Sequence, residues 1–551
     1  MIEVELDGDT EEFNSDKTIL ENCRKQGKEI PTFCEMRGHE PESRCRVCLV
    51  EKDGTLVTSC STYPEEGCTI NTSTERVEKA RERNKDLMRQ SKDDSEAYNL
   101  FKETGIGNNR FEKEEYVVET LGQALARDRD SCVNCGNCVE ICDQIQGVHA
   151  IDFAGRGHES HITPYGEKRL SEVACIRCGQ CLLNCDEDAI FEREHIDKVK
   201  EAINDEDETV VAQTAPAVRA SLGEVFDIDA GTDVEGRMVS ALRKLGFDRV
   251  FDTVFGADLT IVEEASELLQ RLEDGGPFPL ITSCCPSWIM MMEHFYPELR
   301  ENVSTCKSPH EMVGSLTKSY FAENEDLDGE DITVVSVMPC ISKKFESSRS
   351  EIEDDVDFVI TTRELGRMIK EDSISFDELE KGEFDDPLGI STGAGKIFGV
   401  TGGVMEAALR TAAEKLGEDI NLDIKETRGE EGIKKGEITL NGKSIKFAVA
   451  HGGSNIDEVV SDIENGEEIH FVEFMACPGG CIGGGGQPKS DDPEILEKRS
   501  SALYRSDKES GVRLSHENPA VKKVYEDYLD HPLSDMSEEL LHTFFVKRDS
   551  F

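Results

Sequence analysis

The stretch EFMACPGGCIGGGGQP occupies residues 473–488 and holds two cysteines, Cys477 and Cys481. It completes the apolar run EIHFVEFM, which predicts a strand that ends just before Cys477. The four glycines at 483–486 carry no side chain, so the backbone there permits the close approach of a cofactor. The stretch therefore predicts a binding site at the end of a strand.

Two further segments repeat this design. TSCCPSW (282–288) and MPCISKKFE (338–346) each place cysteine beside proline at the end of a predicted strand. Predicted strands alternate with helical patterns through residues 205–551. The predicted strands include TVVAQTAP, RVFDTVF, PFPLITSCC, DITVVSVMPC and SIKFAVAHG. The predicted helices include GRMVSALRKLGF and GVMEAALRTAAEKLG. This order predicts a large α/β domain, a class that tends to build its sites at the carboxyl ends of strands.

Residues 126–200 contain a duplicated cysteine block. CVNCGNCVEIC and CIRCGQCLLNC share the spacing C-x2-C-x2-C-x3-C at an offset of 43 residues, with ligands Cys132, Cys135, Cys138, Cys142, Cys175, Cys178, Cys181 and Cys185. The spacing is typical of two [4Fe–4S] clusters, in which the fourth cysteine of each block binds the other cluster. Zinc is the alternative, but it favours paired C-x2-C steps. The block resembles bacterial two-cluster ferredoxins, except that Asp143 and Asp186 stand where proline often follows.

Residues 1–75 predict a small β-rich domain. Apolar residues alternate from Ile2 to Leu6 as in a half-buried strand, and SDKTILENCRKQG predicts a helix capped by Ser15 or Asp16. Four cysteines follow in a wider pattern: Cys34, Cys45, Cys48 and Cys60. The pattern resembles the β-grasp [2Fe–2S] ferredoxin-like domain that begins large hydrogenases and respiratory NADH dehydrogenase subunits. A zinc site or spare thiols are the alternatives, and Cys23 and Cys68 are expected to be free.

Together, the three cysteine motifs of the large domain closely resemble the signatures of the [FeFe]-hydrogenases. This resemblance implies an H-cluster: a [4Fe–4S] cube on Cys285, Cys340, Cys477 and Cys481, with Cys481 bridging to a diiron subsite that carries CO, cyanide and an azadithiolate. It further implies reversible reduction of protons to dihydrogen, a ferredoxin or similar electron carrier, and partner proteins for maturation of the diiron subsite. The organometallic chemistry belongs to the cofactor, and the protein orients and tunes it.

The same resemblance assigns roles to residues around the cofactor. Protons would pass through Cys284, Glu264, Ser304 and Glu267, with Arg271 a further candidate. Lys343 would contact a cyanide ligand, and Glu346 would orient nearby groups. The pocket would be shaped by Met338, Met475, Pro216, Ala215 and Ser308. His310 stands where some family members carry glutamine, so its role stays open.

Residues 76–125 are charged and predict a helical connector. Neither cysteine nor histidine occurs between Thr69 and Ser131. Larger family members carry there an additional [4Fe–4S] cluster bound by one histidine and three cysteines, so this chain is expected to do without it. Electrons would then enter at the [2Fe–2S] site or directly at the two-cluster module.

The 551 residues include 62 basic and 115 acidic side chains, a formal net charge of −53. Such a surface repels nucleic acid and favours a protein adapted to high salt, as in a halophilic anaerobe. No apolar run is long enough for a membrane span, and the acidic start MIEVELDGD predicts a cytoplasmic protein. Of 20 cysteines, 16 are predicted cluster ligands.

Two other functions compete with a ferredoxin-linked hydrogenase. One is the catalytic subunit of a multisubunit NAD(P)-linked or electron-bifurcating hydrogenase; because no G-x-G-x-x-G fingerprint follows a strand, nucleotide or flavin would then lie on partner chains. The other is a sensory protein or an iron–sulfur assembly factor. Cys284, Glu264, Ser304 and Lys343 are all present, which favours turnover.

Overall fold

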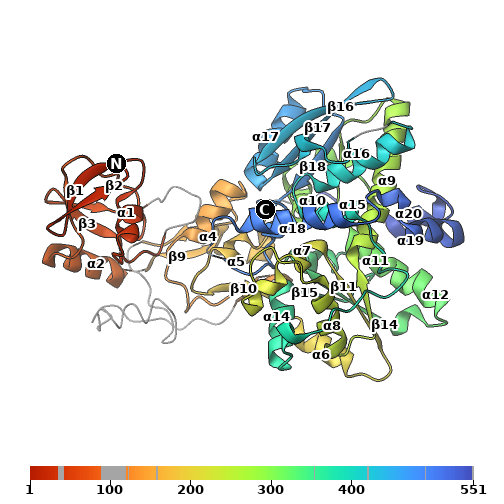
Figure 1. The fold of residues 1–551 in the computed structure, drawn as a ribbon, viewed down its shortest axis with the longest axis horizontal. Coiled ribbons are helices and arrows are strands. Elements are labelled where there is room, and N and C mark those ends of the chain that lie inside the picture. Colours follow the sequence, from red (N-terminus) through yellow and green to blue (C-terminus); the bar gives the residue numbers. More distant parts are fainter. Residues whose placement is uncertain are drawn as a thin grey trace.

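The structure is a computed structural model that describes residues 1–34, 43–87, 119–121, 123–156, 159–352, 354–418, 421–490 and 492–548. Three parts follow one another along the chain (Figure 1): a small N-terminal domain, a cysteine-rich module in the middle, and a large unit with two sheets. The mixed α/β class predicted for the large unit is confirmed. Within the described residues, no helix is both long enough and apolar enough to cross a membrane.

The N-terminal domain is a five-stranded sheet with strand order β2-β1-β5-β3-β4. Its strands are β1 (Ile2–Leu6), β2 (Asp9–Phe13), β3 (Leu49–Lys52), β4 (Thr55–Thr58) and β5 (Thr69–Asn71), packed with α1 (Ile19–Lys25) and α2 (Glu75–Leu87). The cap of α1 is Thr18, not the predicted Ser15 or Asp16. Thr18 forms a capping box with Glu21, which satisfies two backbone N–H groups at once.

The middle module preserves its sequence duplication in three dimensions. Short helices α4 (Asn137–Glu140) and α5 (Gln180–Leu183) follow Gly136 and Gly179, whose positive φ angles of 93° and 74° suit glycine. Two small sheets accompany them: β10-β7-β6 and the hairpin β8–β9. Their strands are β6 (Glu119–Leu121), β7 (Leu125–Arg127), β8 (Ile151–Ala154), β9 (His161–Pro164) and β10 (Ile190–Glu192). Most of the predicted helical connector, residues 88–118, lies outside the described residues.

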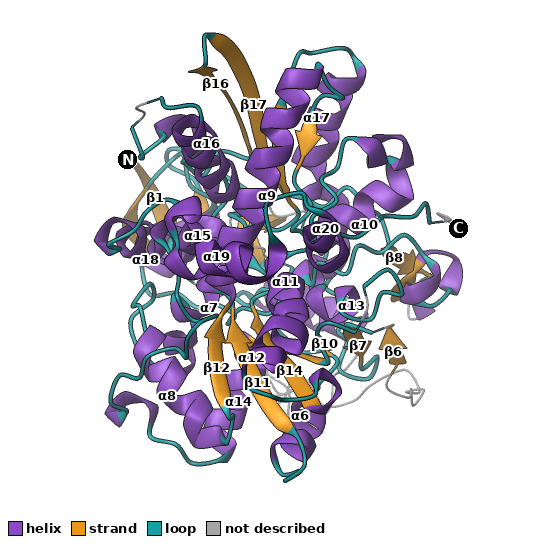
Figure 2. Ribbon diagram, turned by 90° about the vertical axis from the view of Figure 1, so that its right-hand side faces the viewer, coloured by secondary structure: helices purple, strands orange, loops and turns teal. Residues whose placement is uncertain are grey.

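The first sheet of the large unit is fully parallel, with order β12-β11-β14-β15. Its strands are β11 (Thr209–Thr214), β12 (Arg249–Asp252), β14 (Ile332–Met338) and β15 (Phe358–Thr361). Figure 2 shows β12, β11 and β14 side by side, with α9 and α11 above them in that view. The predicted strand RVFDTVF is a strand only in its first half. Strand β12 ends at Asp252, whose side chain caps α9 (Thr253–Asp274).

The second sheet has order β13-β18-β17-β16, and its antiparallel hairpin β16–β17 forms one edge. Its strands are β13 (Leu280–Ile281), β16 (Ile433–Leu440), β17 (Lys443–His451) and β18 (Phe471–Met475). Strand β13 is shorter than PFPLITSCC suggested, because the chain leaves the sheet at Thr282. Motif-bearing strands β13 and β18 thus end at the same edge, in parallel.

Helices surround both sheets. They are α6 (Ile196–Ile203), α7 (Pro216–Arg219), α8 (Glu235–Leu245), α10 (Pro286–Phe295), α11 (Pro309–Leu316), α12 (Ala322–Asn324), α13 (Lys343–Glu346), α14 (Thr362–Glu371), α15 (Gly393–Lys396), α16 (Gly403–Lys415), α17 (Gly453–Glu464), α18 (Ile495–Glu509), α19 (Pro519–Val524) and α20 (Asp535–Leu541). Helix α9 lies between the two sheets and packs against α11 and α16. It therefore carries side chains into the centre of the large unit.

Candidate functional site

Four thiols meet where strands of both sheets end. Cys285 precedes α10 after β13, Cys340 follows β14, and Cys477 and Cys481 follow β18. Cys340, Cys477 and Cys481 each lie close enough to another of the four for its charge to raise their pKa. Burial raises the pKa of these thiols, that of Cys340 to about 12. Four free thiols, two of them buried (Cys340 and Cys477) and two partly buried (Cys285 and Cys481), are the donor set that an iron–sulfur cube requires.

A cavity lies beside these thiols, and Cys340 and Cys481 form part of its wall. Its wall includes the predicted pocket residues Ala215, Pro216, Met338, Lys343 and Met475, together with Cys284 and His310. Four residues that no sequence motif singles out also line it: Thr253, Ala257, Phe398 and Gly399. Ser308 lies outside this wall: it stands at the N-cap position of α11 and borders a neighbouring cavity together with Glu346. The cavity is apolar apart from a few polar groups, as cofactor sites usually are.

Lys343 is anchored at the cavity wall. Its ammonium donates to the backbone oxygen of Cys284 at 3.2 Å and to Glu346 Oε2 at 2.6 Å. The same carboxylate oxygen accepts a hydrogen bond from His310 Nε2 at 2.7 Å. Glu346 therefore contacts the side chains of both Lys343 and His310, which is consistent with the orienting role expected of it.

Glu264 and Glu267 lie one turn apart on α9. Burial, and secondly the neighbouring Glu267 carboxylate, raise the pKa of Glu264 to about 8. Burial and then Glu264 raise the pKa of the Cys284 thiol. Glu267 accepts a hydrogen bond from Arg271 at 2.7 Å, and both side chains reach partly into solvent. Glu264 thus lies near enough to both Glu267 and Cys284 for charge on one group to shift the pKa of the next.

Ser304 is buried next to β13, where its backbone N–H donates to the Ile281 oxygen at 2.8 Å. Its hydroxyl accepts a hydrogen bond from the Cys306 N–H at 3.3 Å. Within the described residues, neither carboxylate oxygen of Glu264 has a hydrogen-bond partner. The structure therefore brings Glu264, Glu267 and Cys284 together without a continuous chain of direct hydrogen bonds through Ser304.

The eight cysteines of the middle module line two cavities. One is bordered by Cys132, Cys135, Cys138 and Cys185, the other by Cys142, Cys175, Cys178 and Cys181. Each cavity thus takes three cysteines from one block and the fourth from the other, as the duplicated spacing predicts. Apolar side chains such as Val148, Ile162 and Ile190 complete the walls.

The cysteines of the N-terminal domain also gather. Cys48 and Cys60 have their sulfurs 3.3 Å apart, and the Cys45 N–H donates to the Cys34 sulfur at 3.3 Å. The two pairs lie close enough for Cys45 to raise the pKa of Cys60, after the larger effects of Cys48 and burial. Cys23 and Cys68 are buried in the same apolar core as Cys48 and Cys60, and it stays a prediction that they are not ligands.

Among the described residues, no three cysteine sulfurs lie as close together as in a zinc site. A Zn–S bond of about 2.3 Å puts the sulfurs of a tetrahedral site about 3.8 Å apart. In the described part of the chain, the only three potential ligands with atoms all within 4.8 Å of one another are His310, Glu311 and Glu346. The spread of the thiols therefore fits clusters better than single ions.

The glycines at 483–486 pack against backbone. A Cβ on Gly485 would lie 2.4 Å from the Cys178 oxygen, and one on Gly484 would lie 2.3 Å from the Pro339 oxygen. The close approach expected of this run thus brings two cysteine loops together. Burial and then the charge of Cys477 raise the pKa of Cys178, which places a ligand of the middle module beside one of the large unit.

Comparison with known proteins agrees with this geometry. Residues 208–485 match the family described as iron only hydrogenase large subunit, C-terminal domain. Residues 493–548 match iron hydrogenase small subunit, and residues 1–75 match a 2Fe-2S iron-sulfur cluster binding domain. The chain therefore belongs to the iron-only ([FeFe]) hydrogenase family, and it is an oxidoreductase that acts on H2.

Similar proteins span nearly the whole chain. The NADP-reducing hydrogenase subunit HndD of Solidesulfovibrio fructosivorans is 40% identical over 100% of this chain and 99% of its own. Iron hydrogenase 1 of Clostridium pasteurianum is 41% identical over 97% of this chain and 98% of its own. A structure of apo [FeFe]-hydrogenase HydA1 from Chlamydomonas reinhardtii is 41% identical, with a TM-score of 0.59, covering 65% of this chain and 100% of that one.

Proposed function

We propose that this hydrogenase reversibly reduces protons to dihydrogen with electrons from ferredoxin, in the cytoplasm. The observation that carries the proposal is the convergence of four thiols, Cys285, Cys340, Cys477 and Cys481, beside a cavity walled by Cys284 and Lys343. The thiols would hold the cube of the H-cluster, and the cavity would take its diiron subsite. When bound, that cofactor supplies the redox chemistry of proton reduction.

The electron route follows packing contacts between the three parts of the chain. Cys45 of the N-terminal domain and Cys135 of the middle module pack into one apolar cluster with Phe33, Val47 and Val133. Two [4Fe–4S] clusters in the middle module would then carry electrons toward Cys178 and Cys477. A [2Fe–2S] cluster on Cys34, Cys45, Cys48 and Cys60 would be the entry point.

The proton route uses groups of α9. Glu267 would take protons at the surface, Glu264 would hold them in the interior, and Cys284 would exchange them with the cofactor. A carboxyl group whose pKa is about 8 both gains and loses a proton near neutral pH, which suits a relay. Because Ser304 makes no direct hydrogen bond to either described carboxylate, ordered water would bridge Ser304 and the glutamates.

Lys343 would stabilise the diiron subsite electrostatically. Its buried ammonium faces the cavity, where an anionic cyanide ligand would be a suitable partner. The side chains of Met338 and Met475 would form a polarisable apolar part of the cavity wall. Ala215 and Pro216 would allow the wall to approach the subsite closely without adding polar groups. Maturation proteins would have to deliver the subsite.

A second candidate is the catalytic subunit of an NADP-linked assembly. The name of the HndD relative, which matches over almost its full length, favours it. Nucleotide and flavin would then be held by partner subunits, which would deliver electrons to the same clusters.

One experiment tests both candidates. The matured chain is assayed for H2 evolution with reduced ferredoxin and, separately, with NADPH, each alone and after addition of co-purifying subunits. Activity of the isolated chain with ferredoxin supports the first candidate, and NADPH activity only with partner subunits supports the second. Inactivity with every donor at full iron content contradicts both.

A further inference from the structure

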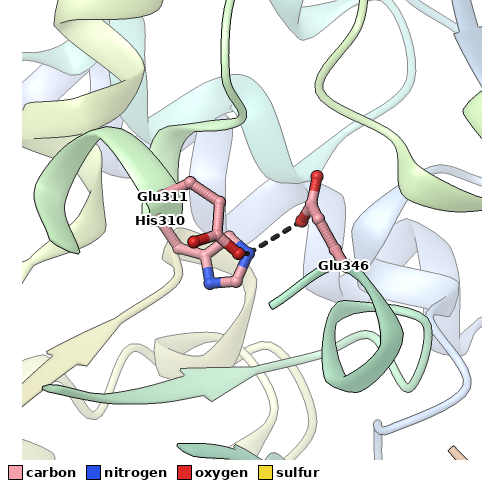
Figure 3. Close-up of side chains that lie close together, drawn as sticks. All are labelled: His310, Glu311 and Glu346. Carbon is pink, nitrogen blue, oxygen red and sulfur yellow. Dashed lines mark hydrogen bonds and ion pairs between the residues drawn. The ribbon is translucent and has the colours of Figure 1, made fainter. Parts of the chain in front are cut away.

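A buried trio of titratable side chains borders the cavity proposed for the diiron subsite. His310 and Glu311 lie in the first turn of α11, and Glu346 ends α13 (Figure 3). All three are inaccessible or nearly so, and His310 itself forms part of the cavity wall. The roles proposed above for Lys343 and Glu346 leave the imidazole of His310 and the carboxylate of Glu311 unexplained.

The hydrogen bonds of His310 fit a protonated ring. Figure 3 shows His310 and Glu346 pointing toward one another from two helices, and Nε2 donates to Glu346 at 2.7 Å. On the opposite side, Nδ1 lies 3.1 Å from the hydroxyl of Ser336 on β14. A hydroxyl donates to a neutral ring nitrogen and accepts from a protonated one. The ring can therefore carry a second proton without losing a partner.

Glu311 needs a neighbouring positive charge. Its Oε1 lies 3.0 Å from His310 Nε2, outside hydrogen-bond geometry. Among the described residues, neither of its oxygens accepts a hydrogen bond. A buried carboxylate without donors is costly unless a cation compensates it. With Lys343 already paired with Glu346, a protonated His310 balances the two carboxylates of the group and a neutral one does not.

A metal ion fits this trio poorly. The Glu346 oxygen that would ligate it already accepts from both Lys343 and His310, at 2.6 and 2.7 Å. A divalent cation would therefore stand beside a buried ammonium group and displace it. The trio is better explained as an internal ion network.

We propose that His310 is a positioning residue that holds a second positive charge at the wall of the cofactor cavity and shares Glu346 with Lys343. The inference rests on the proposed function, because it assumes that the diiron subsite occupies this cavity. Its consequence is electrostatic: the imidazolium ring makes the potential at the subsite more positive, and its bond to Glu346 fixes the carboxylate that directs Lys343. A neutral amide at position 310 would keep the hydrogen bonds and lose the charge.

The surrounding charges support a protonated ring. Burial by itself lowers the pKa of His310, but the Glu311 and Glu346 carboxylates outweigh it and raise the pKa. Lys343 on α13 lowers the pKa of His310. A further charged pair is formed by Lys307 and Asp355, whose ammonium and carboxylate groups lie 2.8 Å apart. The pKa of Asp355 is raised by burial, lowered by Lys307 and, to a smaller extent, raised by the charge of Glu311. The net balance still favours the charged ring.

The test compares wild type, His310→Gln and Glu311→Gln as matured holoenzymes at pH 6. The readouts are the infrared stretching bands of the cyanide and CO ligands and the reduction potential of the H-cluster. Loss of a positive charge is expected to move the bands of His310→Gln to lower frequency and its potential to a more negative value. Loss of a negative charge is expected to move both in the opposite direction in Glu311→Gln.

The outcomes separate this inference from the proposed function. Unchanged bands in either variant, or shifts of both variants in the same direction, would overturn the electrostatic role of His310. If His310→Gln fails to take up the subsite, the near-isosteric Glu311→Gln decides alone, and the lack of an upward shift overturns the role. If wild-type protein shows no cyanide or CO bands after maturation, the proposed function is overturned as well. If wild-type protein shows normal bands, a negative result in the variants overturns only the role of His310.

Discussion

The side-chain amide of Gln180 donates a hydrogen bond of 2.8 Å to the backbone oxygen of Gly483. The bond is buried and joins helix α5 of the middle module to the glycine run of the large unit, 303 residues away. Beside it, the backbone of Cys178 lies against Gly485. The two cysteine loops are thus held together by backbone contact, which suits the transfer of an electron between the clusters that they would bind.

Substitution of Gly485 by alanine is expected to push these loops apart. The new Cβ would lie 2.4 Å from the Cys178 oxygen and 2.8 Å from the Gly179 Cα, and neither is a flexible side chain. Overpacking of this kind costs about 1–3 kcal/mol. We expect a lower thermal unfolding midpoint and slower ferredoxin-driven H2 evolution. The matched control is Gly511→Ala, whose Cβ would meet no atom within 4 Å; equal behaviour of the two variants would contradict the prediction.

Glu264→Gln is expected to abolish most of the turnover while leaving the cofactor in place. The amide preserves the volume of the buried side chain but cannot release a proton inward. Because a positioned acid–base group contributes about 10²–10⁴-fold, H2 evolution should fall by at least about 100-fold. Iron content and infrared bands serve as the check on cofactor loading. The exposed Glu497→Gln on α18 is the control, and a Glu264 variant as active as that control would rule out the relay.

The pH dependence of H2 evolution should report the pKa of Glu264, which burial raises to about 8. Below that pH the carboxyl group is protonated and can donate toward Cys284; above it the group is ionised and cannot. Activity driven by an artificial reductant should therefore decline as the pH rises through about 8. The residual activity of Glu264→Gln should show no step there. A wild-type profile that is flat from pH 7 to 9 would contradict the assignment.

Glu263, the neighbour of Glu264, should anchor the segment that matches the small subunit of iron hydrogenases. Its buried carboxylate accepts hydrogen bonds from the Tyr525 and Ser537 hydroxyls and, at 2.8 Å, from the Leu533 N–H. Glu263→Ala leaves these donors unpaired, at about 1–3 kcal/mol for each. Limited proteolysis should then cleave residues 519–541 first. Glu263→Gln keeps an acceptor oxygen and should be more resistant; equal resistance of wild type and Glu263→Ala would refute the anchor.

Ligand spacing is local, so the sequence can predict which cysteines of a module gather. The crossing of the fourth cysteine between the two blocks follows from their duplication, and the cavities agree with it. Two kinds of feature escaped prediction. The cap of α1 depends on which residue begins the first turn, and three other potential capping residues, Asn14, Ser15 and Asp16, precede Thr18. Phe398 and Thr253 line the cavity beside the four thiols through packing of distant segments and belong to no motif.

His310 shows the limit most clearly. As a single residue in KSPHEMV it has no pattern that predicts a role. Its two partners lie 26 and 36 residues further along the chain, on a strand and on another helix. Only the packing of α11 against β14 and α13 brings the imidazole, the hydroxyl and the carboxylate together.

The net charge of −53 should make both folding and partner docking depend on salt. Screening shortens the range of repulsion from about 30 Å at 0.01 M to about 3 Å at 1 M. We therefore expect the thermal unfolding midpoint to rise as potassium chloride increases from 0.01 to 1 M. An uncharged osmolyte at matched osmolarity is the control for effects other than screening. A midpoint that is independent of salt would contradict adaptation to a saline cytoplasm.

The same charge should give two electron donors opposite responses to salt. An acidic ferredoxin is repelled by this chain, so its rate of electron delivery should increase as salt screens the repulsion. A dicationic viologen is attracted, so its rate at limiting concentration should decrease over the same range. The effect of salt on folding is the same in both assays, whereas the charge of the donor differs in sign. If the two rates change in opposite directions with salt, the effect therefore arises from electrostatics at the docking step. Parallel slopes would show that salt acts on the stability of the protein instead.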